Sequence, residues 1–392
     1  MQRFEQDDRP QQLEPPPPRM PAWVDGSAAG PPRRGTLVLV VVVAVLVLAA
    51  AVGLTVVVRA RHDAAPPPVA AAPPADVLPA PVQGSVATSV PTPTAVATIP
   101  VGATPGYMEV APGGGFAYIA NRTANVLTVL DTTRNAVTAT IPVPDGGPQF
   151  VAFSPDGARA YVSISDPGFT VNELGVVDTR TGAFVARVPT GKRPFALVVA
   201  PDGRRVYVPN HDSSSITVVD TATDTVAGTI PVAPNPHWLD LSPDGTRLYA
   251  ANHESDLVTT VDTGTDAVVG TVAVGRSPHS VVRHRTRPLL LDADYDGSTV
   301  SVTDVDTNRV VATVPTASHP QDISLSADGR YAYLAAVDAN AVQVLDTTSL
   351  RVTANVPVGR GPTSVAVAPD GRRAYVTNLD DGTVTVLDVG TP

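Results

Sequence analysis

The chain contains no cysteine among its 392 residues. It therefore has no disulfide framework, no thiolate metal site, no cysteine nucleophile and no covalently attached c-type haem. Aromatic residues are also few, at 5% of the chain, whereas 41 prolines and 30 glycines accompany abundant Val and Thr. Such a composition favours strands and turns over helices.

Positive charge is scarce in most of the chain. Residues 1–62 hold seven Arg and five acidic residues, so the remainder carries 20 basic and 32 acidic side chains, a net charge of −12. Nucleic-acid affinity depends largely on Lys and Arg that displace counterions, so we expect no nucleic-acid partner. The sequence also lacks G-x-S-x-G, H-E-x-x-H, a P-loop and a G-x-G-x-x-G at a strand-to-helix turn.

One long apolar run stands out near the N-terminus. Residues 36–58 are 23 positions without a charge, and a helix of that length reaches roughly 34 Å, enough to cross a bilayer. A cleaved signal peptide is the alternative. However, the Pro-rich polar segment of residues 1–35 is longer than the N-terminal region of a usual signal peptide, and the apolar run is longer than a usual signal-peptide hydrophobic region. We expect an uncleaved signal anchor, with residues 1–35 as a disordered cytoplasmic tail.

Residues 59–94 form a Pro/Ala-rich linker, typical of a semi-rigid spacer that holds a domain away from a surface. The sequence therefore predicts a single-pass protein of the cell membrane, with residues 95–392 as an extracytoplasmic domain.

Internal repeats dominate that domain. Each unit opens with a proline, passes through a P-D-G turn and a tyrosine, and closes its third apolar run with an aspartate. The closing aspartates are separated by 47 residues once and then by 42 residues five times; they are Asp131, Asp178, Asp220, Asp262, Asp304, Asp346 and Asp388.

Each unit has the alternation of strands, with a P-D-G turn suited to a tight hairpin. Four antiparallel strands in about 42 residues is the geometry of a propeller blade. The seventh unit ends after its third strand, and the missing run stands before the first unit as residues 95–102, "AVATIPVG". We therefore predict an all-β, seven-bladed propeller in which the N-terminal strand closes the last blade.

Residues 375–378 read Tyr-Val-Thr-Asn, and "SPDG" followed by a tyrosine occurs at residues 154–161 and 242–249. In these motifs the domain resembles the YVTN-repeat β-propellers, over roughly residues 95–392. The resemblance implies a seven-bladed propeller of an extracytoplasmic or surface protein. It implies little about activity, since similar propellers include binding modules, lactonase-like enzymes and cofactor-bearing oxidoreductases.

The loops from fourth to first strands and from second to third strands should share one face of the ring. Five histidines fall in these loops, and imidazoles with nearby carboxylates suit Zn, Cu or Fe. Polar loop positions of a repeat also accept histidine without any ligand, and that interpretation stays open. The candidate ligand-binding residues are His237, His279, His319, Trp238, Asp240 and Gln321, and the candidate metal ligands are His211, His253, Asp292, Asp294 and Asp296.

Unit five departs from the pattern. Asp292, Asp294, Asp296 and Gly297 match the first half of a D-x-D-x-D-G calcium loop, but position twelve is Thr303 instead of a bidentate Glu. Calcium binding and structural drift of one blade are both open.

The leading functional hypothesis is a binding scaffold at the cell envelope, for a protein, a glycan or a small molecule. The alternative is a metal-dependent lactonase-like hydrolase or a cofactor-using oxidoreductase, with His237, His279 and His319 as ligands or general bases and Asp240 or Asp294 assisting. A divalent metal, Ca, Zn or Cu, is the cofactor that the pattern allows.

Overall fold

The computed structural model describes residues 86–391. The predicted tail, the predicted transmembrane helix and most of the predicted linker lie outside the described residues. Among residues 86–391, no helix has the length and apolar character needed to cross a membrane.

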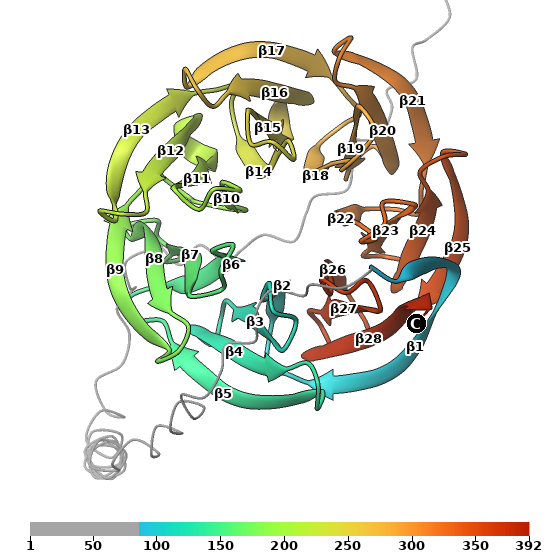
Figure 1. The fold of residues 1–392 in the computed structure, drawn as a ribbon, viewed down its shortest axis with the longest axis horizontal. Helices are drawn as coiled ribbons and strands as arrows, with labels where there is room; N and C mark the ends of the chain where they lie inside the picture. Colours follow the sequence, from blue (N-terminus) through green and yellow to red (C-terminus); the bar gives the residue numbers. More distant parts are fainter. Residues whose placement is uncertain (1–85, 392) are drawn as a thin grey trace, which may run out of the picture. The chain divides into compact units, whose positions relative to one another are not determined.

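The described chain folds into seven four-stranded antiparallel sheets arranged as the blades of a propeller (Figure 1). We number the blades 1 to 7 in the order of their innermost strands. These strands are β2 (Pro105–Val110), β6 (Gly147–Phe153), β10 (Val198–Val199), β14 (Pro236–Leu241), β18 (Pro278–Arg283), β22 (Pro320–Leu325) and β26 (Pro362–Val367). The second strands are β3 (Phe116–Asn121), β7 (Arg159–Ser165), β11 (Arg205–Asn210), β15 (Arg247–Asn252), β19 (Leu289–Asp294), β23 (Tyr331–Ala336) and β27 (Arg373–Asn378).

The third and fourth strands complete each blade toward the outside of the ring (Figure 1). The third strands are β4 (Val126–Asp131), β8 (Asn172–Asp178), β12 (Ser215–Asp220), β16 (Leu257–Asp262), β20 (Thr299–Asp304), β24 (Ala341–Asp346) and β28 (Thr383–Thr391). The outermost strands are β5 (Ala136–Pro142), β9 (Ala183–Pro189), β13 (Thr225–Pro231), β17 (Ala267–Ala273), β21 (Arg309–Pro315), β25 (Arg351–Pro357) and β1 (Thr88–Pro100). Two 3-10 turns, η1 (His211–Ser213) and η2 (His253–Ser255), follow β11 and β15.

Ring closure is as predicted. Strand β1 is the outermost strand of blade 7 and pairs antiparallel with β28, in the order β1-β28-β27-β26. The first strand begins at Thr88, seven residues before the predicted start of the domain at Ala95. Thr94 pairs with Asp388, and Ser89 pairs with Gly390. The last part of the predicted linker is therefore part of the sheet.

The repeated motifs have local structural roles. In the P-D-G turn of blade 2, Gly157 has φ 71°, which favours glycine, and Asp156 Oδ1 accepts a hydrogen bond from the Ala158 amide at 3.0 Å. The asparagine that ends the second strand ties that strand to the third: Asn210 Nδ2 donates to Thr217 Oγ1 at 2.9 Å. The repeated motifs thus specify the turns and the hydrogen bonds between strands of a blade. The hydrophobic core packs between neighbouring blades, as in the cluster formed by blades 5 and 6.

Candidate functional site at the upper mouth

We call the face formed by the fourth-to-first and second-to-third loops the upper face, and the opposite face the hairpin face. Each innermost strand except the short β10 carries a β-bulge directly after the proline that opens its unit. In blade 4, Pro236 pairs with Asn252 and Trp238 pairs with Ala251, so His237 is the extra residue; in blade 5 His279 holds the same position. A bulge re-aims a side chain, and here it adds one residue per blade at the channel mouth.

Four histidines of blades 3, 4 and 5 meet at this mouth; they are His211, His237, His253 and His279, which we call the histidine cluster. The rings of His237 and His279 have centroids 4.2 Å apart, and those of His253 and His279 are 4.7 Å apart. The His211 ring lies 6.0 Å from His253 and 6.2 Å from His237. The structure therefore brings together residues separated by up to 68 positions in the chain.

Three imidazoles of the cluster are held toward their neutral form. Burial and the neighbouring His279 hold the pKa of His237 well below its usual range, and burial with His253 nearby lowers the pKa of His279 to about 3. Burial also lowers the pKa of His253. Neutral imidazoles carry lone pairs that can bind a metal ion or accept a proton.

Two of the rings are oriented by hydrogen bonds at Nδ1. His237 Nδ1 lies 2.8 Å from the carbonyl oxygen of His279, which requires Nδ1 to carry the proton. His211 Nδ1 lies 2.6 Å from Asp212 Oδ1. In both rings Nε2 is left as the lone-pair donor.

The other candidate ligand residues line the continuation of this mouth. Tyr295 stacks on His279 with ring centroids 4.9 Å apart, and His319 stacks on Tyr295 at 4.6 Å. His319 Nδ1 lies 2.6 Å from Asp338 Oδ2. Gln321 occupies the bulge position of blade 6, where blades 4 and 5 have histidine. Tyr295 escaped the sequence reasoning because it belongs to the blade whose repeat pattern is broken.

An aromatic plug, formed by Tyr107, Phe150, Phe195 and Trp238, lies against the histidine cluster. Tyr107 of blade 1 meets Trp238 of blade 4 with ring centroids 5.5 Å apart, although these blades are not neighbours in the ring. Phe150 lies 4.8 Å from Tyr107 and 5.2 Å from Trp238. The four rings join blades 1 to 4, and we call the region of the upper mouth above them the cup.

Three carboxyl groups lie on the inner strands at or below the plug; they are Glu109, Asp240 and Asp322, which we call the channel acids. Asp240 Oδ2 accepts from the Arg283 amide at 2.6 Å. Asp322 accepts from the Val365 amide at 2.8 Å and from Ser280 Oγ at 2.9 Å. Asp240 and Asp322 thus link neighbouring blades.

The channel acids are held toward their neutral form. Burial among protein atoms raises the pKa of Glu109 to about 7, and it raises the pKa values of Asp240 and Asp322 to about 6. Glu109 and Asp240 keep some accessible surface because they face the channel, although protein surrounds them on all sides.

The three acids of unit five lie in two different settings. Asp292 and Asp294 lie in strand β19 and both are fully buried, whereas Asp296 is exposed in the following turn. A calcium loop presents its acids from one irregular turn, which a strand buried between blades does not do. Asp294 takes the place of the repeat's asparagine and accepts from Ser301 Oγ at 2.8 Å. Burial and the neighbouring Asp294 raise the pKa of Asp292 well above its usual range.

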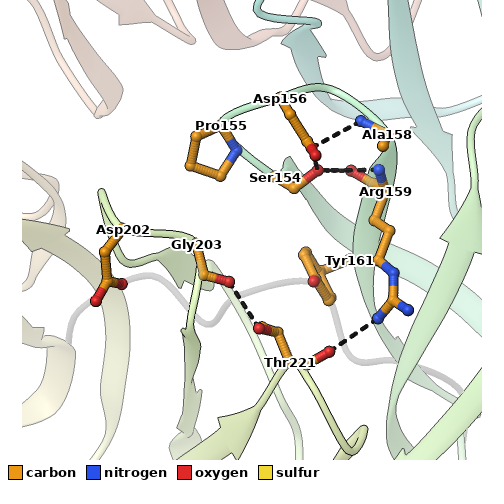
Figure 2. Close-up of a pocket in the computed structure, with 9 residues that line it drawn as sticks. All are labelled: Ser154, Pro155, Asp156, Ala158, Arg159, Tyr161, Asp202, Gly203 and Thr221. Carbon is orange, nitrogen blue, oxygen red and sulfur yellow. Dashed lines mark hydrogen bonds between the residues drawn. The ribbon is translucent and has the colours of Figure 1, made fainter.

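A pocket of about 320 Å³ lies on the hairpin face between blades 2 and 3 (Figure 2). Its wall includes Arg159, whose Nη1 donates to the Thr221 carbonyl at 3.0 Å and to Asp224 Oδ1 at 2.9 Å. The next blade repeats this contact, since Arg205 Nη1 donates to the Thr263 carbonyl at 3.1 Å. The pocket is thus a gap beside a repeated structural brace, and we do not regard it as the functional site.

Comparisons with known proteins agree with this architecture. A family model described as "Lactonase, 7-bladed beta-propeller" matches residues 220–391, which is less than half of the chain. The seven-bladed beta-propeller protein Rv1057 of Mycobacterium tuberculosis is 30% identical over 127 residues, or 31% of this chain and 30% of that protein. The aligned region thus spans about a third of the relative's length.

The fold is also similar to that of a chain of Kuenenia stuttgartiensis hydrazine synthase, with a TM-score of 0.65 at 21% identity, covering 78% of this chain and 98% of the other. At such identity the likeness concerns the fold alone. Fold, topology and these matches together define a seven-bladed β-propeller.

Proposed function

We propose that this protein is a binding module held at the cell envelope, and that the cup at its upper mouth is the recognition site. The observation that carries this proposal is the meeting of the histidine cluster with the aromatic plug, where the ring centroids of His237 and Phe195 lie 4.3 Å apart and those of His237 and His279 lie 4.2 Å apart. The apolar run at residues 36–58 supports attachment to a membrane.

The chemistry of the cup supports a ligand with polar and flat apolar parts. The stacked rings of His279, Tyr295 and His319 offer faces for stacking, and their nitrogens and hydroxyl offer hydrogen bonds. Elsewhere on the upper face the Arg193 guanidinium lies 5.5 Å from the ring centroid of Phe169, which belongs to the longer loop of blade 2. Apolar faces with a polar rim are typical of recognition sites.

The test compares the two faces of the ring. The full-length protein, immobilised and exposed to solubilised envelope fractions, should retain a specific component. Retention should be lost in a Tyr295→Ala/Phe169→Ala variant and preserved in an Arg204→Ala variant, which alters an exposed side chain of the hairpin face. Equal retention by both variants would exclude the upper mouth as the recognition site.

A lactonase-like hydrolase is the second candidate, favoured by the family model that matches residues 220–391. The neutral His237 and His279 could act as general bases for water attack on a lactone carbonyl. Proton release from a panel of simple lactones, followed in a pH-stat, should then depend on both histidines. Turnover that survives His237→Gln/His279→Gln would remove this role from the cluster.

A further inference from the structure

We propose that the upper mouth binds one divalent transition-metal ion through His211, His253 and Glu254. This inference rests on the proposed function only in placing the ion where the ligand would bind. One potential ligand atom of each of the three residues lies within 4.8 Å of those of the other two. Small side-chain rotations bring three such atoms to the distance at which they can share an ion with bonds of about 2.0–2.2 Å.

The repeat itself supplies the symmetry of this site. His211 begins η1 and His253 begins η2, each directly after the asparagine that ends the second strand. Asn210 and Asn252 are both fully buried and hydrogen-bonded into their blades, so both turns start from fixed points. Two imidazoles are thereby presented at equivalent positions on neighbouring blades.

The orientation of His211 is that of a metal ligand. Its Nδ1 is paired with Asp212 Oδ1 at 2.6 Å, so its Nε2 faces away with a free lone pair. Metal-bound histidines commonly donate their other ring proton to a carboxylate in this way. Asp212 Oδ1 also lies 3.6 Å from Arg193 Nη1, which helps to fix the carboxylate.

The second histidine has an unused nitrogen. Nδ1 of His253 is buried and has no hydrogen-bond partner among the described residues. A buried polar atom without a partner costs free energy, and coordination would remove that cost. Glu254 is exposed at the rim and can turn its carboxylate inward without disturbing the core.

The donor set selects the kind of ion. Two imidazoles and one carboxylate suit Zn, Cu, Ni or Co, whereas Ca and Mg prefer sites made of oxygen ligands. Three protein ligands leave a position open, and the solvent-facing cup leaves that position accessible to a ligand. His237 and His279 lie beside the site, with the His237 ring centroid 5.6 Å from that of His253.

The experiment uses full-length protein carrying no histidine tag and freed of metal with a chelator. Calorimetric titration with Zn²⁺ should give one ion per chain, and Co²⁺ should develop visible d–d absorption. Loss of an outer carboxylate partner costs about 10- to 100-fold in metal affinity, so Asp212→Asn should weaken binding by that factor. His211→Gln/His253→Gln, which removes two ligands directly, should weaken it further.

His319→Asn is the matched control. His319 lies on the same face and is paired with an acid, but outside the three-residue site, and asparagine tolerates its left-handed backbone with φ 55°. It should bind metal as the wild type does. Glu254→Gln alters only an exposed side chain, so weaker binding there cannot be attributed to misfolding.

Wild-type protein that takes up no stoichiometric Zn²⁺ or Co²⁺ would overturn the inference. So would uptake that is unchanged in both Glu254→Gln and the double-histidine variant. The retention experiment with the Tyr295→Ala/Phe169→Ala variant reports on the recognition site without any metal, so failure of the metal site and failure of the proposed function are separable.

Discussion

The mouth and the channel below the plug differ in the kind of ionisable group that each collects. Above the plug stand imidazoles whose pKa values are lowered by burial, and at or below it stand carboxyl groups whose pKa values are raised by burial. The physical cause is the same in both regions, because the ring of blades keeps water away and disfavours the charged form. Both regions are therefore held toward their uncharged forms.

The two neutral regions nevertheless have different chemistry. A neutral imidazole has a lone pair for a metal ion or a proton, whereas a neutral carboxyl group becomes a hydrogen-bond donor. Asp240 and Asp322 already bridge neighbouring blades, and Glu109 accepts a hydrogen bond from the Tyr107 hydroxyl at 3.0 Å. The difference is consistent with the proposed ligand site at the mouth, whereas the channel acids brace the ring.

Removing the barrier between the regions should have the largest effect. Trp238 is 8% exposed and contacts rings of blades 1 and 2, so Trp238→Ala should lower the free energy of unfolding by about 3–5 kcal/mol. Urea unfolding at pH 7 measures the loss. Trp238→Phe, which keeps a ring in the plug, should lose much less. A loss below about 1 kcal/mol for the Ala variant would mean that the rings do not jointly fill the channel.

Sequence reasoning recovered the architecture because its signals are local. Turn residues, strand alternation and a period of about 42 residues recur in most blades, and the missing fourth strand of the last blade appears at the other end of the chain. The exception is residues 88–94, whose prolines suggested a linker. Pro91 and Pro93 lie in the irregular stretch of strand β1 between the paired residues Ser89 and Thr94, so their missing amide hydrogens remove no bond from the ladder.

The site was less accessible to sequence reasoning because it depends on the dimensions of the ring. The equivalent positions of His237 and His279 on adjacent blades indicated that both would face the mouth, and the structure places them in contact. The meeting of Tyr107 with Trp238 joins blades that are not adjacent, which no repeat pattern indicates. Glu109 and Asp322 were missed as well, although an acid on a strand that should line the channel was a usable signal.

The acids buried between blades provide a second test of the difference between the mouth and the channel, since they have no channel beside them. Asp292 is fully buried, and neither of its carboxyl oxygens has a hydrogen-bond partner among residues 86–391. Its counterparts are apolar in the other six blades, as with Val208 and Val376. Replacing buried ionisable groups with apolar ones often stabilises a protein by about 1–4 kcal/mol, so Asp292→Val should raise the free energy of unfolding at pH 7.

The pH dependence identifies the cause of that gain. A raised pKa means that the folded protein holds its proton more tightly than the unfolded chain, so the penalty at Asp292 grows as the pH rises above about 4. Unfolding curves at several pH values should show the advantage of Asp292→Val shrinking toward pH 4. Asp292→Asn retains a buried polar group and should gain less. Destabilisation by Asp292→Val at pH 7 would assign the carboxyl a necessary contact.

The channel acids should produce a smaller effect with a definite pH window. Because the pKa of Glu109 is raised in the folded protein, its carboxyl group contributes fully to stability below pH 4.5. That contribution is lost as the pH rises to about 7. Glu109→Gln keeps a hydrogen-bonding partner for Tyr107 and cannot ionise, so the variant should gain about 1–2 kcal/mol relative to the wild type between these pH values. The histidines of the mouth have the opposite pH dependence. Because their pKa values are lowered in the folded protein, their contribution to stability is complete above pH 6.5 and is progressively lost as the pH falls below that value. Subtracting the Glu109→Gln stability curve from the wild-type curve isolates the acid, and a difference that does not change between pH 4.5 and 7 would show that Glu109 ionises in the folded ring as it does in the unfolded chain.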